Sequence, residues 1–246
     1  MARPLGRPRS SWAPRCLVLQ HEADTPPGLI ADWLEEQTAQ VETVRIDEVQ
    51  PNVDPRDYDL VVVLGSEHAA YDDSLPFLAP EMRLLSAAHE ADVPTLGVCF
   101  GGQLLARVLG ARVFRIAAGP EIGWLKVRTH HPELLGEGPW LQWHYDGFSL
   151  PPGSQLIAET DVGVQAFVAG RTMGLQCHPE VTPEIVAGWA RLSSQELAKD
   201  GVDPQALVDQ TSKRERESKV AAWRLLDRFR DRVVGEQGVA ARDKRH

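Results

Sequence analysis

The sequence predicts an α/β fold in which a mostly parallel sheet is covered by helices on both faces. Short apolar runs alternate with helix-like patterns over residues 16–110. Strands that alternate with helices form right-handed βαβ units, which place parallel strands side by side. Beyond residue 111 the strand-like runs come closer together, and this spacing predicts an antiparallel section added to the sheet.

Apolar runs predict the strands of the parallel section. The run over Leu60–Leu64 is almost wholly β-branched and ends at Gly65, which is typical of a buried strand. The other predicted strands of this section are Cys16–Gln20, Val41–Ile46 and Pro94–Phe100. Between them, helical patterns predict helices over about 28–39 and 77–91.

Five short strands are predicted for the antiparallel section. They are Arg112–Ile116, Gly123–Thr129, Leu156–Glu159, Gln165–Val168 and Gly174–Cys177. Thr182, Pro183 and Glu184 then predict the start of a helix, because they supply an N-cap, a first-turn proline and an acid that the helix dipole favours. Together the elements predict a three-layer, flavodoxin-like fold with a C-terminal helical extension.

Charge divides the 246 residues into three predicted parts. Residues 1–15 hold four arginines and no acid, and we expect a flexible basic arm there. Residues 16–195 are strongly acidic and form the predicted domain. Residues 196–246 hold 12 basic and 10 acidic residues, and apolar residues at helical spacing predict an amphipathic helix. That helix either packs on its own domain or binds a partner.

Composition limits the classes of partner. The net charge of −9 argues against nucleic acid as the main partner. No apolar run approaches the 18 or more residues of a membrane-spanning helix. Three cysteines cannot form a full disulfide framework, which favours a reducing compartment. We therefore expect a cytoplasmic globular protein that binds neither nucleic acid nor a membrane.

The segment VCFGGQ, residues 98–103, lies between a predicted strand and a predicted helix. A residue at such a turn is held in a strained, exposed position, as the nucleophile of a hydrolase is. Gly101 and Gly102 leave room for close chain approach and for a substrate backbone. The helix N-terminus favours the thiolate form of Cys99. The alternative is that Cys99 is a small buried apolar residue.

The segment QCHPE, residues 176–180, supplies the groups that a thiol nucleophile needs. His178 follows a predicted strand, and Pro179 stiffens the chain so that Glu180 can turn back towards the imidazole. A carboxylate on one ring nitrogen fixes the tautomer and leaves the other nitrogen for sulfur. Alternatively, His178 is a hydrogen-bonded edge residue and Glu180 belongs to the first turn of the next helix.

The two segments GVCFGGQLLA and QCHPE resemble the motifs of the class I (triad) glutamine amidotransferases, and the resemblance covers about residues 16–192. Within that family, the WH-x-D and HPEVTPE segments are most similar to the stand-alone type that resembles the glutaminase domain of GMP synthetase. The resemblance implies that Cys99 attacks the glutamine amide, forms a γ-glutamyl thioester and releases ammonia. It also implies that His178 is the general base and acid and that Glu180 orients it.

The resemblance further implies an oxyanion hole. One donor is the backbone N–H of Phe100, and the other comes from a turn that reads Gly-Gly-Pro in the family. Here that turn contains Gly65 and Ser66, and Glu67 stands in place of the proline. The donor survives the serine provided that φ is not forced positive. A lost oxyanion donor would cost about 10²–10³ in rate, so activity depends on this turn.

Substrate-binding residues are implied as well. Gln103 matches the motif glutamine that contacts the backbone groups of the substrate, and Gly101 gives that backbone room. His144 and Asp146 match the H-x-D segment, in which the acid binds the substrate α-ammonium group. The alternative for Asp146 is a turn-forming aspartate before Gly147.

No metal or cofactor is expected. His130 and His131 are adjacent, so they point apart on a strand, and no third ligand follows at zinc-like spacing. Neither a P-loop pattern nor a dinucleotide fingerprint after a strand is present. Cys177 replaces an aromatic residue of the family and is expected to be inert packing, although a disulfide with Cys99 is an alternative.

Three functions remain open from the sequence. The chain hydrolyses glutamine and supplies ammonia to a partner synthetase, or it hydrolyses γ-glutamyl peptides, or it is a non-catalytic amidotransferase-like binding module. About 50 residues follow the predicted domain, which is too few for an ATP-using synthetase domain. The ammonia acceptor is therefore expected on another chain.

Overall fold

The computed structural model describes residues 12–49 and 51–235. An eight-stranded sheet runs through it in the order β2-β1-β3-β4-β12-β11-β10-β7. Its strands are β1 (Arg15–Gln20), β2 (Gln40–Arg45), β3 (Leu60–Val63), β4 (Thr95–Val98), β7 (Arg128–Thr129), β10 (Gln155–Glu159), β11 (Val164–Ala169) and β12 (Thr172–Leu175). Neighbouring strands pair in parallel in the part β2-β1-β3-β4-β12. They pair antiparallel in the part β12-β11-β10-β7. The predicted α/β fold with an added antiparallel section is confirmed.

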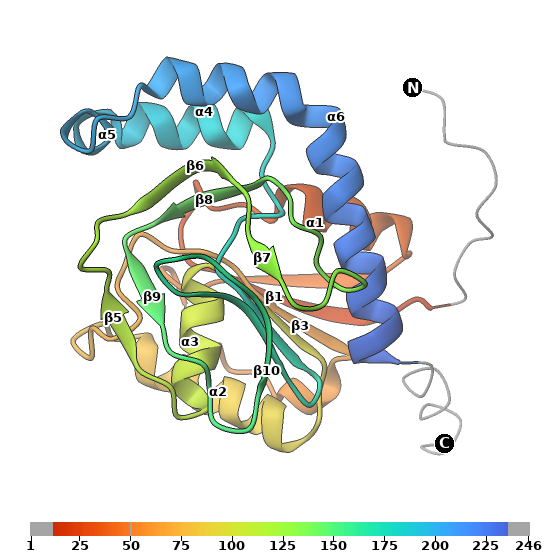
Figure 1. Ribbon diagram of the computed structural model, residues 1–246. Coiled ribbons are helices and arrows are strands. Elements are labelled where there is room, and N and C mark those ends of the chain that lie inside the picture. The colour runs from red at the N-terminus through yellow and green to blue at the C-terminus, as the bar shows by residue number, and fades with distance from the viewer. Residues whose placement is uncertain (1–11, 50, 236–246) are drawn as a thin grey trace.

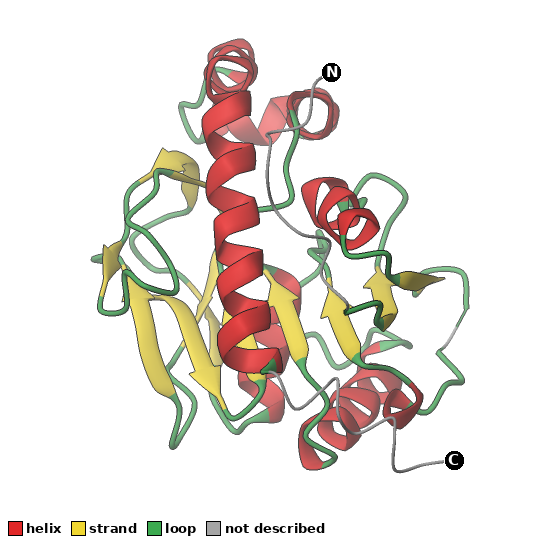
Figure 2. Cartoon of the chain, turned by 90° about the vertical axis from the view of Figure 1, so that its right-hand side faces the viewer, coloured by secondary structure: helices red, strands yellow, loops and turns green. Residues whose placement is uncertain are grey.

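Helices cover both faces of the sheet (Figures 1 and 2). They are α1 (Gly28–Glu36), α2 (Leu78–Glu90), α3 (Phe100–Val108), α4 (Pro183–Leu192), α5 (Ser194–Lys199) and α6 (Pro204–Phe229), with short helical turns at Pro55–Asp57 and Arg230–Val234. Residues of α1 and α6 form one apolar cluster with the sheet, and residues of α2 and α3 form the other. The molecule therefore has three layers.

The central strands are buried on both faces because alternate side chains point to opposite sides. In β1, Cys16 and Val18 join the cluster under α1 and α6. Leu17 and Leu19 join the cluster under α2 and α3. All four side chains are fully buried. This burial is why the predicted strands read as continuous apolar runs rather than as alternating ones.

Two small sheets lie beside the main one. They are formed by β5 (Val113–Arg115) with β9 (Asp146–Phe148), and by β6 (Glu121–Leu125) with β8 (Trp140–His144). The prediction of one strand over Gly123–Thr129 is wrong, because the chain leaves β6 and then joins the main sheet as β7. The region of β8 and β9 was not predicted to form strands.

Strand β12 joins the two parts of the main sheet. It pairs in parallel with β4 on one side and antiparallel with β11 on the other. The predicted strand Gly174–Cys177 is therefore shifted, because the pairing with β4 runs only from Thr172 to Leu175. Beyond Leu175 the chain leaves β4, and the His178 N–H donates to the Leu141 oxygen at 2.9 Å.

The C-terminal helices pack on their own domain. Thr182 caps α4 as predicted, its hydroxyl accepting a hydrogen bond from the Ile185 N–H at 3.4 Å. From α6, Leu225, Leu226 and Phe229 are buried in the cluster shared with α1. Figure 2 shows this long helix lying across one face of the sheet. The alternative in which this apolar stripe is left for a partner is wrong.

The ends of the chain are described only in part. Residues 1–11 of the expected basic arm, and residues 236–246, lie outside the described residues. Trp12 is 7% exposed and packs against Trp33 with ring centroids 5.9 Å apart, and β1 already begins at Arg15. In the described ranges, no helix is long and apolar enough to cross a membrane.

Candidate active site

Four neighbouring parallel strands end at one edge of the sheet, and the residues that follow them carry the candidate site. His21 follows β1, Gly65 lies two residues beyond β3, Cys99 follows β4, and His178 lies three residues beyond β12. In open α/β sheets, ligands bind outside the carboxyl ends of parallel strands. The topology alone therefore brings together residues that are far apart in the sequence.

Cys99 occupies a strained turn between β4 and α3. Its backbone has φ 51° and ψ −110°, a left-handed conformation that costs energy for a residue with a side chain. The predicted strain is confirmed. The expected exposure is not, since Cys99 is only 6% exposed.

The two glycines after Cys99 allow α3 to approach the sheet closely. A Cβ atom on Gly101 would lie 2.2 Å from the Val63 oxygen, and one on Gly102 would lie 2.3 Å from the Leu175 oxygen. Any larger residue would push the helix away from β3 and β12. The N–H of Gly101 also donates to the Leu64 oxygen at 3.2 Å. Packing thus accounts for both glycines, and a contact between Gly101 and substrate stays a prediction.

His178 and Glu180 form a buried pair. The imidazole Nδ1 lies 2.7 Å from Glu180 Oε1, and the two residues are 4% and 2% exposed. The backbone holds both ends of this segment, since the His178 N–H donates to the Leu141 oxygen at 2.9 Å and the Leu29 N–H donates to the Glu180 oxygen at 2.8 Å. The carboxylate therefore has a fixed position relative to the ring.

The electrostatics of this pair favour a protonated imidazole. Burial on its own would lower the pKa of His178, but the Glu180 carboxylate and the Cys99 sulfur outweigh it and raise the pKa well above its usual value. Nε2 of His178 has no hydrogen-bond partner among the described nitrogen and oxygen atoms. That nitrogen is therefore available to the sulfur.

The sulfur of Cys99 lies among groups from several elements. A Cβ atom placed on Gly65 would be 3.8 Å from the Cys99 Cβ and 3.3 Å from the His178 Cε1, so the thiol and the imidazole adjoin the same residue. The Gln176 amide Nε2 donates to the sulfur at 3.7 Å, and the sulfur donates to the Trp143 carbonyl oxygen at 3.9 Å. The structure brings thiol, imidazole and carboxylate together, and their catalytic roles stay predictions.

Two tryptophans form a wall of the site that sequence reasoning missed. The ring of Trp189 packs edge-on against His178 with centroids 4.9 Å apart, and Trp143 packs edge-on against Trp189 at 5.6 Å. The indole N–H of Trp189 donates to the Asp24 oxygen at 2.7 Å. Trp189 belongs to α4, so this helix supplies part of the packing around the imidazole.

The turn that contains Gly65 and Ser66 meets the condition set for an oxyanion donor. Within the described ranges, Thr38, Asp92 and Cys99 are the residues other than glycine with positive φ, so the backbone of Ser66 suits an ordinary residue. The Ser66 and Phe100 N–H groups have no hydrogen-bond partner in the described part of the chain. Both donors are therefore available, and their catalytic use stays a prediction.

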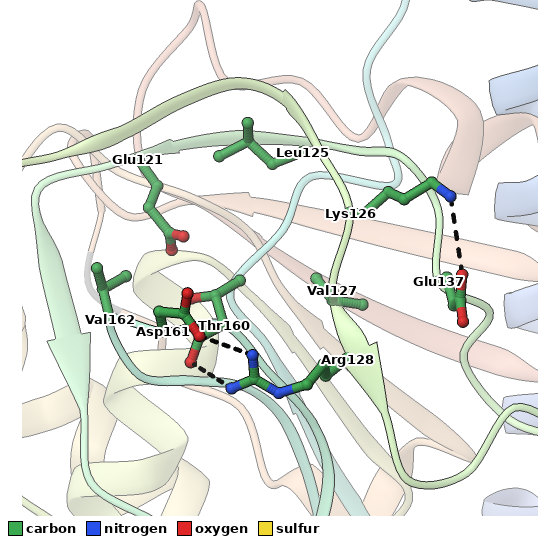
Figure 3. Close-up of a pocket in the computed structure, with 9 residues that line it drawn as sticks. All are labelled: Glu121, Leu125, Lys126, Val127, Arg128, Glu137, Thr160, Asp161 and Val162. Carbon is green, nitrogen blue, oxygen red and sulfur yellow. Dashed lines mark hydrogen bonds and ion pairs between the residues drawn. The ribbon is translucent and has the colours of Figure 1, made fainter.

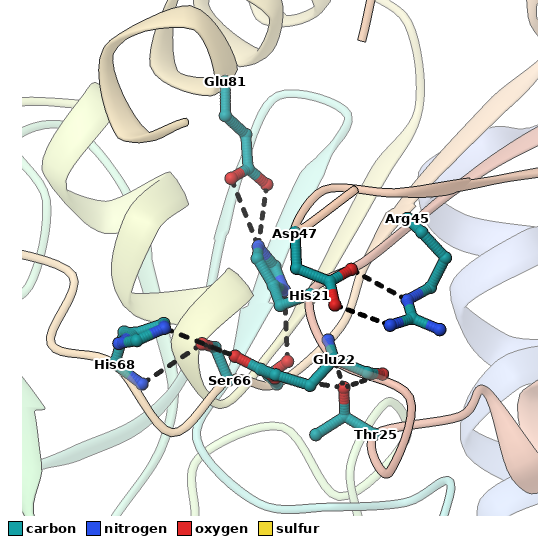
Figure 4. Close-up of polar contacts among 9 residues, drawn as sticks. His21, Glu22, Thr25, Arg45, Asp47, Ser66, His68 and Glu81 are labelled. Carbon is teal, nitrogen blue, oxygen red and sulfur yellow. Dashed lines mark hydrogen bonds and ion pairs between the residues drawn. The ribbon is translucent and has the colours of Figure 1, made fainter. Parts of the chain in front are cut away.

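The serine side chain has a function of its own in this turn. Its hydroxyl donates to Glu22 Oε1 at 2.5 Å and accepts from the His68 N–H at 3.1 Å, as Figure 4 shows. Burial raises the pKa of Glu22, and the bond from Ser66 opposes that shift. The serine that stands in place of the family's second glycine thus adds a hydrogen bond between this turn and Glu22.

The side chains of Gln103 and His144 form hydrogen bonds with other residues of the protein. The Gln103 amide Nε2 donates to the Asp146 carbonyl oxygen at 3.1 Å and to Gln176 Oε1 at 3.3 Å. His144 Nδ1 lies 3.0 Å from the same Asp146 oxygen, and its Nε2 lies 3.1 Å from Glu121 Oε2. Both predicted substrate-binding residues therefore position Asp146, and any direct contact with substrate stays a prediction.

Asp146 lies in a strand and not in a turn. It begins β9 and pairs with Arg115 of β5, so the reading of a turn-forming aspartate is wrong. Its carboxylate accepts a hydrogen bond from the Tyr71 hydroxyl at 3.3 Å and lies 3.7 Å from Arg115 Nη1. The Arg115 side chain is 61% exposed and stacks on Tyr145. An anion and a cation thus lie side by side near the site.

The other chemistry-bearing residues of the sequence lie in ordinary structural settings. Cys177 is fully buried, and that burial, together with the nearby Glu180 and Cys99, raises the pKa of its thiol. His130 pairs with Glu159 and His131 pairs separately with Glu133. Among the described residues no three potential metal ligands gather in one place.

A pocket of about 450 Å³ is lined by the residues that Figure 3 draws as sticks, between Glu121 and Val162. Its rim carries two ion pairs, Arg128 with Asp161 at 2.7 Å and Lys126 with Glu137 at 3.9 Å. Cys99, His178 and Glu180 do not line it. Glu121, which lines this pocket, also contacts His144 of the candidate site.

Sequence comparisons identify similar proteins. The family profile described as "Glutamine amidotransferase class-I" matches residues 27–186. A glutamine amidotransferase-like protein of Salmonella typhimurium, YfeJ, is 29% identical over 199 residues, which are 72% of this chain and 80% of that protein. A GMP synthase [glutamine-hydrolyzing] of Thermus thermophilus is 36% identical over 129 residues. Those residues are 49% of this chain but only 24% of that enzyme.

Solved structures show the same similarity over most of the chain. A glutamine amidotransferase of Thermotoga maritima has a TM-score of 0.80 and 31% identity, and the match covers 87% of this chain and 97% of that one. A glutamine amidotransferase of Methylobacillus flagellatus has a TM-score of 0.80 and 28% identity, covering 88% and 94%. These matches cover a larger share of the chain than the family profile does.

Proposed function

The chain belongs to the class I glutamine amidotransferases, and from that membership we propose that it hydrolyses the side-chain amide of glutamine at Cys99 and releases ammonia. The observation that carries the proposal is the 2.7 Å bond between His178 and Glu180 in a buried site that also holds the Cys99 sulfur. A nucleophile, a base and an orienting carboxylate in this order are what amide hydrolysis through a covalent intermediate needs.

In the first half of the proposed reaction the enzyme is acylated. His178 Nε2 takes the proton of the Cys99 thiol, and the sulfur attacks the side-chain carbonyl carbon of glutamine. The negative charge on the carbonyl oxygen is stabilised by the Phe100 and Ser66 N–H groups. The imidazolium then returns its proton to the amide nitrogen, the C–N bond breaks, and ammonia leaves a γ-glutamyl thioester on Cys99.

In the second half water regenerates the enzyme. His178 takes a proton from a water molecule as the water oxygen attacks the thioester carbon. The attack forms a second oxyanion on the carbonyl oxygen. The C–S bond breaks, glutamate leaves, and the imidazolium returns the proton to the thiolate. Glu180 keeps Nδ1–H of His178 bonded throughout, so that Nε2 is the nitrogen that exchanges protons.

The α-amino-acid end of the substrate is proposed to bind at Asp146 and Arg115. Free glutamine carries an ammonium and a carboxylate on the same carbon. Asp146 and Arg115 present the two opposite charges 3.7 Å apart. Each charged substrate group then meets an opposite charge, and glutamine within a peptide chain, which lacks both, would be rejected.

We propose further that the ammonia is used by a synthetase on a partner chain. The support is the similarity to GMP synthases described as glutamine-hydrolysing, of which this chain matches about a quarter. A γ-glutamyl peptide offers the same scissile carbonyl and the same α-amino-acid end as glutamine. The relative rates with these two substrates therefore decide between a glutaminase and a γ-glutamyl hydrolase.

The experiment is a steady-state assay on the purified chain. Ammonia release from glutamine and cleavage of γ-glutamyl dipeptides are measured for the natural sequence, for Cys99→Ala and for the control Cys16→Ala. The proposal expects ammonia from glutamine with the higher kcat/KM, its loss in Cys99→Ala, and unchanged turnover in the control. Cleavage of dipeptides alone, or undiminished turnover in Cys99→Ala, would overturn it.

A further inference from the structure

A second histidine–carboxylate pair lies behind the turn that contains Gly65 and Ser66. His21 and Glu81 are 1% and 0% exposed. Nε2 of His21 lies 3.2 Å from both Glu81 oxygens, and Nδ1 lies 3.1 Å from the Gly65 carbonyl oxygen. Figure 4 shows the imidazole between the Glu81 carboxylate on one side and this turn on the other.

The partners of the ring determine its charge. A carbonyl oxygen only accepts hydrogen bonds, and so does an ionised carboxylate. A neutral imidazole has one N–H and can satisfy only one of them, whereas an imidazolium satisfies both. Burial alone would lower the pKa of His21, but Glu81, and to a lesser extent Glu22 and the Gly65 carbonyl, outweigh it and raise that pKa. The two acceptors and the raised pKa both favour the charged ring, which donates to the Gly65 oxygen.

The bond to Gly65 acts on Ser66 through the peptide group that the two residues share. The Gly65 carbonyl and the Ser66 N–H belong to one planar amide, and in a trans peptide they point in opposite directions. A cation on the oxygen draws electrons through the amide and makes the N–H a stronger donor. It also fixes the direction of that N–H away from His21.

The same imidazole touches the other half of the predicted oxyanion hole. Its ring packs edge-on against the Phe100 ring with centroids 4.6 Å apart. Phe100 supplies the other candidate donor and begins α3. One buried side chain thus contacts Phe100 and the Gly65 carbonyl of the peptide group whose N–H belongs to Ser66.

We propose that His21, held by Glu81, is a positioning residue that fixes and polarises the Gly65–Ser66 peptide group, so that the Ser66 N–H stabilises the oxyanion. This inference rests on the proposed function. It predicts an effect on the transition state and not on substrate binding, since the oxyanion forms only after attack.

The test uses His21→Gln and Glu81→Gln, with His130→Gln as the matched control from an exposed histidine–glutamate pair. The glutamine at position 21 can still donate to the Gly65 oxygen, but it carries no charge. We expect kcat for glutamine to fall by about tenfold in both variants, less than the loss of a whole oxyanion donor. KM and the rate at which iodoacetamide alkylates Cys99 should stay within about twofold, because alkylation forms no oxyanion.

A readout that does not depend on turnover separates this inference from the proposed function. The amide proton of Ser66 is followed by NMR in the natural chain and in the three variants. It should move upfield when His21 loses its charge and stay in place in the His130→Gln control.

Three outcomes would overturn the inference. The first is an unchanged Ser66 resonance, and the second is a kcat that His21→Gln does not affect. The third is a fall of kcat and alkylation rate together, as in a general structural defect. A natural chain without glutaminase activity would overturn the proposed function instead, and would leave the NMR shift to decide the polarisation.

Discussion

The imidazole of His178 and the carboxylate of Glu180 are bonded at 2.7 Å although only one residue separates them in the chain. Such a short loop closes because Pro179 stiffens it and because backbone bonds to Leu141 and Leu29 hold its ends. The pair is therefore formed before any substrate arrives.

Glu180→Gln tests the orienting carboxylate. Glutamine can donate as well as accept, so it no longer selects the Nδ1–H tautomer, and it removes the charge that raises the pKa of His178. We expect kcat for glutamine hydrolysis to fall by about 10²-fold or more, with KM nearly unchanged. Glu184→Gln, an exposed residue in the first turn of α4, is the control and should retain full activity. Equal activity of the two variants would contradict the role given to Glu180.

Asp146→Asn tests recognition of the α-ammonium group. The change removes one charge and keeps the hydrogen bond that Gln103 makes to the backbone of residue 146. We expect KM for glutamine to rise by about tenfold or more, since the lost interaction involves a charged group, with kcat little changed. Initial-rate kinetics measure both, with Asp161→Asn as an exposed control. An unchanged KM combined with a lower melting temperature would show that Asp146 serves structure only.

Ser66→Gly restores the glycine of the family turn. Because the Ser66 backbone has no positive φ and its hydroxyl bonds to Glu22, the change removes an anchor and relieves no strain. We expect kcat to fall by about fivefold, which corresponds to one ordinary hydrogen bond of about 1 kcal/mol. Steady-state turnover of glutamine is the measurement. A higher kcat in Ser66→Gly would mean that the serine impairs the turn.

Alkylation should distinguish the three cysteines. Burial raises the pKa of Cys16 to about 12 and also raises that of Cys177, which adjoins Glu180. Iodoacetamide near neutral pH should therefore label Cys99 in the folded chain and leave the other two unmodified. Peptide mass spectrometry identifies the labelled residue, and denatured protein, in which all three react, is the control. Labelling of Cys177 as fast as Cys99 would contradict the assignment.

The His21–Glu81 pair should make stability depend on pH. The pKa of His21 is raised in the folded chain above its ordinary value of about 6.5. A histidine whose pKa is raised on folding contributes its full stabilisation at pH values below the ordinary pKa of about 6.5. That contribution is lost as the pH rises through the pKa of the folded chain. Glu81→Gln should therefore lower the free energy of unfolding by about 3 kcal/mol at about pH 6, and by less at about pH 9. Denaturant melts of both proteins measure the difference, and a gap that stays constant or widens with pH would contradict this account.

The buried β-branched run before Gly65 and the helical patterns around it were enough to predict the parallel sheet, because burial on both faces leaves a strong sequence signal. The small sheets were harder. Strands β8 and β9 contain Trp140, His144 and Asp146, polar and aromatic residues whose partners lie on distant segments. Pairing of this kind depends on tertiary contacts that local patterns do not encode.

The triad segments could be located from the sequence because both follow strands and have distinctive composition. His21 also directly follows a strand, and that position was a signal that sequence reasoning did not use. Glu81, by contrast, reads as a first-turn acid of α2, and only the packing of α2 on the sheet shows that it is fully buried against His21. Long-range burial of a charge cannot be predicted from local spacing.

The covalent intermediate is the most direct test of the central claim. The purified chain is mixed with glutamine, quenched with acid during turnover, digested and examined by mass spectrometry for a γ-glutamyl group. The account predicts that this group is found on the Cys99 peptide while ammonia is produced. Production of ammonia with an unmodified Cys99, or with the group on Cys16 or Cys177, would contradict it.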